Sequence, residues 1–188
     1  MNRRDILRLT ATMTGAAVVA PLASTLLTSC NMEPVIPFKP AYFTEDEYAL
    51  IKTIADIILP KTDSPAASEV GAPQMIDQMV GTVYDEEDKI EHKEKFAALL
   101  LFLNGEENKS PFIDKSEEEQ FTIIKSIEDR EVEIELVKDA YLEIKQQTIA
   151  YYLSSEEISK NYLNFLPVPG EYEPCITVEE AGGKAWAI

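Results

Sequence analysis

One histidine, two cysteines and many carboxylates are the side chains of this sequence that could do chemistry. His92 lies between Glu91 and Lys93, and we expect it on the solvated face of a helix. A lone histidine cannot supply a His pair for a metal, and no Cys-x-x-Cys occurs. No Gly-x-Gly-x-x-Gly, phosphate loop or Gly-x-Ser-x-Gly pattern is present. The sequence therefore predicts no catalytic residue, no metal site and no nucleotide site in this chain.

The carboxylates cluster at the expected starts of helices. Residues 85–88 and 117–119 are acidic runs of this kind, and negative charge there complements the helix dipole. Paired carboxylates perform acid–base catalysis only when their environments differ, so capping explains these runs without catalysis. Asp56, Asp63 and Asp77 lie nearer apolar sequence. We expect the Asp63 side chain, within Pro-Lys-Thr-Asp-Ser-Pro, to fold a turn, with contact to a partner as the alternative.

The first thirty residues have the layout of an export signal. Arg3, Arg4 and Arg8 form a basic start, and residues 9–29 carry no charge. The paired arginines with the apolar pair and basic residue after them resemble the twin-arginine motif. General secretion is one alternative to this route, and an uncleaved anchor helix is another.

Cys30 ends the apolar run, and Leu-Thr-Ser-Cys resembles a lipobox, whose cysteine is acylated and becomes the new N-terminus. A conventional cleavage site is the alternative. A lipid anchor at Cys30 would hold the exported chain on the periplasmic side of a membrane. Cys175 then has no partner in the chain; we expect it to be buried, or else to pair with another protein.

The sequence divides into residues 1–29, a twin-arginine-type lipoprotein signal peptide, residues 30–41, a proline-rich tether, and residues 42–188, a single helical domain. Apolar periodicity predicts an all-α fold of five or six helices. Capping boxes start helices at Thr44 and Ser116, and Pro60 ends the first. Others are expected after Pro73, over 86–104, over 131–153 and, capped by residues 154–157, towards Tyr162.

The expected core includes the apolar end of the 86–104 helix, residues 96–103, which is apolar all round. In the 131–153 helix the expected inward residues are Leu136, Ala140, Leu142, Ile144, Ile149 and Tyr152. The formal net charge of −17 predicts repulsion of nucleic acid and of anionic lipid headgroups.

An extended tail rich in proline and aromatic residues begins at about Asn161. Pro167, Pro169, Gly170 and Pro174 exclude a regular helix there. Its apolar side chains must be covered either by this domain or by a partner. The candidate interface residues are Asp63 and the tail aromatics Tyr162, Phe165, Tyr172 and Trp186.

The order of several motifs from about residue 41 to 175 resembles the gluconate 2-dehydrogenase subunit 3 family. They are Ile-Leu-Pro-Lys-Thr-Asp-Ser-Pro at 58–65, Met-Ile-Asp at 75–77, Tyr-Tyr-Leu-Ser at 151–154 and Pro-Gly-Glu-Tyr-Glu-Pro-Cys at 169–175. Two positions depart from the family pattern: Ala66-Ala67 stand where Gly-Ala is common, and Pro174 stands where glycine usually precedes the cysteine. Both departures concern loop geometry.

This resemblance implies a non-catalytic small subunit that supports export and assembly of a large one. In the family, a flavoprotein of the glucose–methanol–choline oxidoreductase type carries FAD and oxidises a sugar or sugar acid. A cytochrome c subunit often takes the electrons. We therefore expect FAD in the partner and no cofactor in this chain. The alternative is a stand-alone helical periplasmic lipoprotein that binds a ligand or an envelope component.

Overall fold

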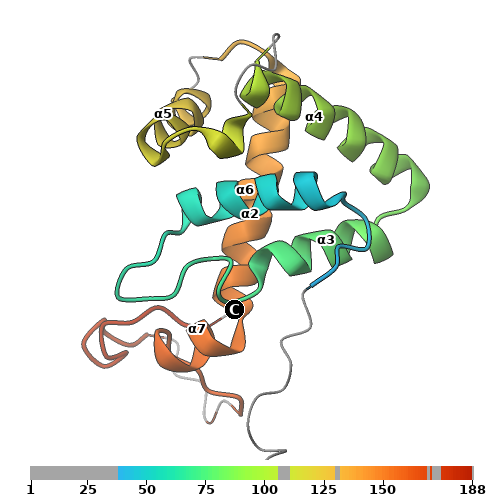
Figure 1. Ribbon diagram of the computed structural model, residues 1–188. Helices are drawn as coiled ribbons and strands as arrows, with labels where there is room; N and C mark the ends of the chain where they lie inside the picture. The colour runs from blue at the N-terminus through green and yellow to red at the C-terminus, as the bar shows by residue number, and fades with distance from the viewer. Residues whose placement is uncertain (1–37, 106–110, 130–131, 169, 171–174, 188) are drawn as a thin grey trace, which may run out of the picture. The chain divides into compact units, whose positions relative to one another are not determined.

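The computed structural model describes residues 38–105, 111–129, 132–168, 170 and 175–187. Their α-helices are α2 (Glu45–Ile58), α3 (Ala72–Thr82), α4 (Glu86–Asn104), α5 (Glu117–Glu128), α6 (Glu135–Ser154) and α7 (Glu156–Asn161), with a 3-10 turn, η1 (Phe112–Asp114), before α5 (Figure 1). Within these ranges there is no β-strand, only one isolated bridge. The predicted all-α fold is confirmed. The predicted signal peptide, with Arg3, Arg4 and Cys30, lies outside the described residues.

Short-range capping starts three of the helices. Thr44 and Ser116 each form the predicted capping box, in which the hydroxyl accepts from the third residue's N–H and that residue's glutamate accepts from the cap. The Asp85 carboxylate accepts from the N–H groups of Glu87 and Asp88, both at 2.9 Å. The acidic runs thus cap helices as predicted.

The third predicted cap does not form. Ser155 stands at the start of α7, but its hydroxyl donates to the carbonyl oxygen of Tyr152, at 2.7 Å. The side chain is therefore engaged with the end of α6 rather than with the first amides of α7.

Helix α6 lies at the centre of the packing, because it contacts all the other described α-helices. Figure 1 shows it crossing behind α2, with α7 following directly at its end. Its buried side chains are Val137, Ala140, Tyr141, Ile144, Thr148 and Tyr152. The prediction was wrong for Leu136 and Leu142, which are 47% and 48% exposed. They flank the 137–141–144–148 stripe, so they point away from the core.

Helix α4 buries one stripe rather than its whole apolar end. Phe96, Leu99 and Leu103 are buried, but Leu101 is 62% exposed, which contradicts the expectation of burial all round. The stripe begins one turn earlier, at His92, which is only 5% exposed. The prediction of a solvated His92 is therefore wrong: its charged sequence neighbours leave from other faces of the helix, while residues 92 and 96 share the face toward the core.

A second, smaller apolar cluster lies beneath the loop between α2 and α3. Ala55, Ala67, Ala72, Tyr152 and Ile158 form it, so it joins this loop to four helices. Ala66 and Ala67 of the loop are both buried. The loop therefore rests on its own core.

No helix in the described part of the chain is both long and apolar enough to span a membrane.

Candidate interaction surface

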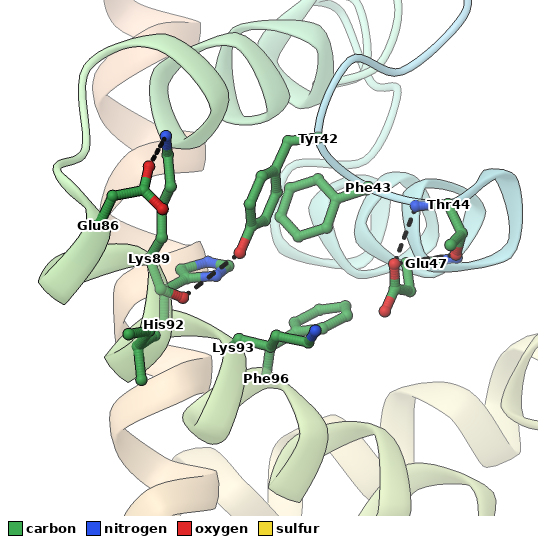
Figure 2. A pocket seen from close by; sticks show the side chains of 10 residues that line it. Tyr42, Phe43, Thr44, Glu47, Glu86, Lys89, His92, Lys93 and Phe96 are labelled. Carbon is green, nitrogen blue, oxygen red and sulfur yellow. Dashed lines mark hydrogen bonds and ion pairs between the residues drawn. The ribbon is translucent and has the colours of Figure 1, made fainter.

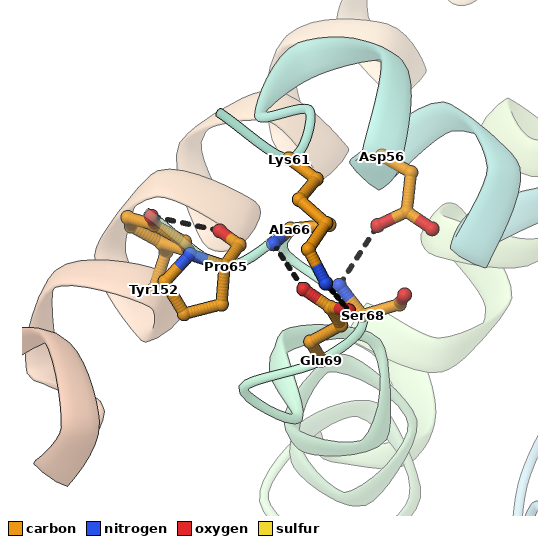
Figure 3. A network of polar contacts seen from close by, with 7 residues as sticks. All are labelled: Asp56, Lys61, Pro65, Ala66, Ser68, Glu69 and Tyr152. Atoms are coloured by element: carbon orange, nitrogen blue, oxygen red, sulfur yellow. Dashed lines mark hydrogen bonds and ion pairs between the residues drawn. The ribbon is translucent and has the colours of Figure 1, made fainter. Parts of the chain in front are cut away.

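The loop of residues 59–71, between α2 and α3, is fixed by carboxylates (Figure 3). Asp56 Oδ1, near the end of α2, accepts from the N–H of Ser68 at 2.8 Å. The Glu69 carboxylate accepts from the N–H of Ala66 at 2.9 Å and from Lys61 Nζ at 2.7 Å. The Lys61 ammonium, followed by the Ala66 N–H, lowers the pKa of Glu69. The loop is thus bound both to α2 and across its own width.

Two tyrosines from the far end of the sequence hold the same loop. The Tyr152 hydroxyl, on α6, lies 2.8 Å from Ser64 Oγ and 3.0 Å from the carbonyl oxygen of Pro65. The Tyr162 hydroxyl, just after α7, donates to the carbonyl oxygen of Asp63 at 2.9 Å. The structure therefore brings together Asp63 and Tyr162, two of the predicted interface residues.

The Asp63 side chain does not fold the turn. The turn is closed instead by the N–H of Thr62, which donates to the carbonyl oxygen of Ser64 at 3.0 Å. Among the described residues no group donates to the Asp63 carboxylate, and the residue is exposed. The expectation of a turn-forming side chain is wrong, and the carboxylate stands beside a hollow of about 470 Å³ that Lys61, Glu157 and Tyr162 also line.

Asn164 organises the tail. Its N–H donates to the carbonyl oxygen of Ala185 at 2.8 Å, and its own carbonyl oxygen accepts from the N–H of Ala187 at 3.0 Å. Its amide nitrogen also donates to the carbonyl oxygen of Lys184 at 2.9 Å. The described residues after Asn161 contain no helix, as predicted, but the end of the tail returns to pair beside residue 164. This pairing brings the chain next to Phe165 and the chain around Trp186 together.

The tail carries a concentration of exposed apolar side chains. Of the seventeen large apolar residues that are exposed in the described structure, seven lie between residues 162 and 186. They are Tyr162, Phe165, Leu166, Val168, Ile176, Val178 and Trp186. We call these seven, together with residues 61–65 of the loop, the loop–tail surface. Large exposed apolar side chains in such number on one segment indicate an interaction site.

The predicted interface residues have different outcomes. Tyr162, Phe165 and Trp186 are 37%, 45% and 52% exposed, so they are not core residues of this domain. Tyr172 lies outside the described residues. Cys175 is exposed and forms no disulfide in the described part of the chain, which contradicts its expected burial.

Sequence reasoning missed the residues that anchor the loop. Tyr152 is predicted only as an apolar inward residue, yet its hydroxyl forms hydrogen bonds to the loop. The sequence gives no sign that Glu69 holds the loop together. The family motifs at 58–65 and 151–154 were the available signal, because the structure joins these two segments. Within the described ranges, no group of three His, Cys, Asp or Glu side chains could hold a metal ion.

Together these features define a small all-α protein with a firmly anchored loop beside an exposed apolar tail, an arrangement suited to binding another protein. The sequence profile of the family described as gluconate 2-dehydrogenase subunit 3 matches residues 45–170. The match spans more than half of the chain, which therefore belongs to this family, whose members are subunits of a dehydrogenase complex. It includes the loop and Tyr162 but ends before Cys175 and Trp186. No curated protein and no solved structure matches the chain.

Proposed function

We propose that this chain is the non-catalytic small subunit of a membrane-tethered, FAD-dependent dehydrogenase of a sugar or sugar acid. Its partner is a large flavoprotein of the glucose–methanol–choline type, which carries the FAD, and a cytochrome c subunit takes the electrons. Family membership supports this proposal, and so does a sequence without any pattern for a nucleotide or metal site.

The loop–tail surface is the observation that carries the proposal. Aromatic side chains dominate the energetics of many protein interfaces, and Tyr162, Phe165 and Trp186 are exposed on this surface. The loop beside them is held by Asp56, Glu69 and two tyrosines. A surface that is already ordered loses less conformational entropy on binding. We assign the loop–tail surface to the flavoprotein.

Export and anchoring follow from the leader. The twin-arginine route moves folded proteins. A chain without a cofactor site of its own has a reason to use this route if it is exported together with a folded partner that carries a cofactor. On this proposal the chain escorts the flavoprotein through the cytoplasmic membrane, and acylated Cys30 then holds the complex on the periplasmic side.

Co-purification tests the interface. The tagged full chain, co-expressed with the candidate flavoprotein, should retain a yellow, FAD-containing partner. Phe165→Asp should lower the retained flavin at least about tenfold, because a lost aromatic anchor costs more than about 1.4 kcal/mol. Phe121→Asp is the matched control. This phenylalanine is 56% exposed on α5 and is not part of the loop–tail surface, so the substitution should leave flavin retention unchanged. If the chain purifies as a colourless monomer that never retains the flavoprotein, the subunit proposal is wrong and the stand-alone lipoprotein is favoured.

Removal of residues 1–29 tests the escort separately. The co-expressed flavoprotein should then stay in the cytoplasm, whereas Cys30→Ser should still permit export but release the complex from the membrane. Normal export of the flavoprotein beside the truncated chain would refute the escort, while leaving the interface untouched.

A further inference from the structure

The segment that leads into α2, residues 41–43, is strapped to the domain by one buried carboxylate. The N–H groups of Ala41, Tyr42 and Phe43 donate to Asp77, at 2.7, 3.0 and 3.0 Å. Asp77 lies on α3 and is fully buried. We call residues 41–43 the strap. Ala41 is the last residue of the predicted tether, and Tyr42 is the first residue of the predicted helical domain.

The single histidine of the chain lies under this strap (Figure 2). The ring centroids of Tyr42 and Phe43 are 6.0 and 5.6 Å from that of His92. Phe96 stacks on the imidazole at 6.1 Å, and Tyr84 meets it edge-on at 6.0 Å. The imidazole is thus enclosed by four aromatic rings, two of which belong to the strap.

The polar surroundings of His92 suit the neutral ring. His92 Nε2 lies 4.0 Å from Glu143 Oε1, but that oxygen already accepts from the Tyr84 hydroxyl at 2.9 Å. Gln147 in turn donates to the Tyr84 hydroxyl at 2.7 Å. His92 Nδ1 is buried, and no described group offers it a hydrogen bond. An imidazolium has two N–H donors, so protonation would leave a buried donor at Nδ1 without an acceptor.

Charges around the ring act in both directions. Burial lowers the pKa of His92 and is the largest influence; Glu143 of α6 raises it, Lys95 of α4 lowers it, and Glu47 of α2 raises it. The other titratable groups that line the hollows on either side of the ring are Tyr42, Tyr84, Glu86, Asp88, Lys89, Glu91 and Lys93. The net direction is below the ordinary 6.5.

We propose that His92 is an acid-sensitive latch: the neutral ring holds the strap against α4, and protonation releases it. The sign follows from linkage. A group whose pKa is lower in the closed form binds its proton more readily in the open form. Closure is therefore unaffected by pH above about 6.5 and weakens as the pH falls below that value.

The composition makes the test clean, because histidine is the side chain whose ordinary pKa lies between pH 5 and 8 and His92 is the only one. The full chain is titrated by NMR at the imidazole while amide exchange is followed at Ala41, Tyr42 and Phe43. Protection of these amides, corrected for intrinsic rates, should fall between pH 7.5 and 5. The protection should fall by a factor that approaches ten for each pH unit by which the titration midpoint of His92 lies below 6.5.

Two substitutions and one control decide the outcome. His92→Gln and His92→Phe should each abolish the pH dependence of protection; the glutamine variant carries the test if the phenylalanine variant does not fold. Asp77→Asn should lower protection at both pH values while the histidine still titrates. A midpoint at or above 6.5, or protection that is the same at pH 5 and 7.5 in the unmodified chain, would overturn the latch.

Discussion

At the scale of single residues, one carboxylate, that of Asp77, holds a whole segment of backbone in place. Its carboxylate lies in the core and accepts from three consecutive N–H groups of the strap. Buried polar groups need hydrogen-bond partners, and here the carboxylate and the N–H groups of the strap supply them to each other. The sequence placed Asp77 near apolar residues, but nothing local indicates a strap that lies more than thirty residues earlier.

Asp77→Asn should therefore destabilise the domain. The asparagine amide keeps one acceptor oxygen and brings an NH₂ group toward the N–H donors, so at least one N–H group of the strap loses its acceptor. The expected loss is about 1–3 kcal/mol in the free energy of unfolding, measured by denaturant titration. Asp139→Asn, at an exposed position on α6, serves as the control and should change it by less than about 0.5 kcal/mol. Equal losses in the two variants would argue against the strap.

At the scale of elements, the loop of residues 59–71 shows how α6 and α7 shape a segment far away in sequence. Tyr152 and Tyr162 reach this loop across 87 to 99 positions, and Ala67 packs on the small core beneath it. The loop is thus part of the fold, although its outer side is exposed. This is why the two distant family motifs belong to one surface.

Tyr152→Phe should loosen this loop while it keeps the buried ring. The hydroxyl contact with Ser64 and Pro65 is lost, which should cost about 1 kcal/mol of unfolding free energy and speed amide exchange at Ala67. Tyr151→Phe is the matched control, because this neighbouring hydroxyl makes no hydrogen bond within the described structure and its change should cost less than about 0.5 kcal/mol. If the two variants lose equal stability, the loop does not depend on Tyr152.

The elements also show what the sequence could predict. The capping boxes at Thr44 and Ser116 involve residues only three positions apart, so a short stretch of sequence is enough to predict them. The helices begin where these capping boxes indicate. Burial depends on which helices meet, and this information is not local. His92 was therefore expected in solvent, and Leu136 and Leu142 in the core, although the structure places them the other way round.

At the scale of the whole molecule, charge is the dominant surface property. The chain has a net charge of −17, and lysine–glutamate pairs at 2.5 to 3.1 Å neutralise only part of the acid. Exposed pairs of this kind contribute little stability, whereas the uncompensated carboxylates repel one another over the whole surface.

This balance predicts the sign of the salt response. The Debye length falls from about 30 Å at 0.01 M to about 10 Å at 0.1 M salt, which screens repulsion between distant carboxylates but hardly affects pairs in direct contact. Raising NaCl from 10 to 200 mM at pH 7.5 should therefore raise the unfolding midpoint by about 2–4 °C, equivalent to about 1 kcal/mol for a chain of this size. Near pH 4.4, the pI of the sequence, the same addition should have little effect because the net charge is close to zero. A midpoint that falls with salt at pH 7.5 would mean that the ion pairs outweigh the repulsion.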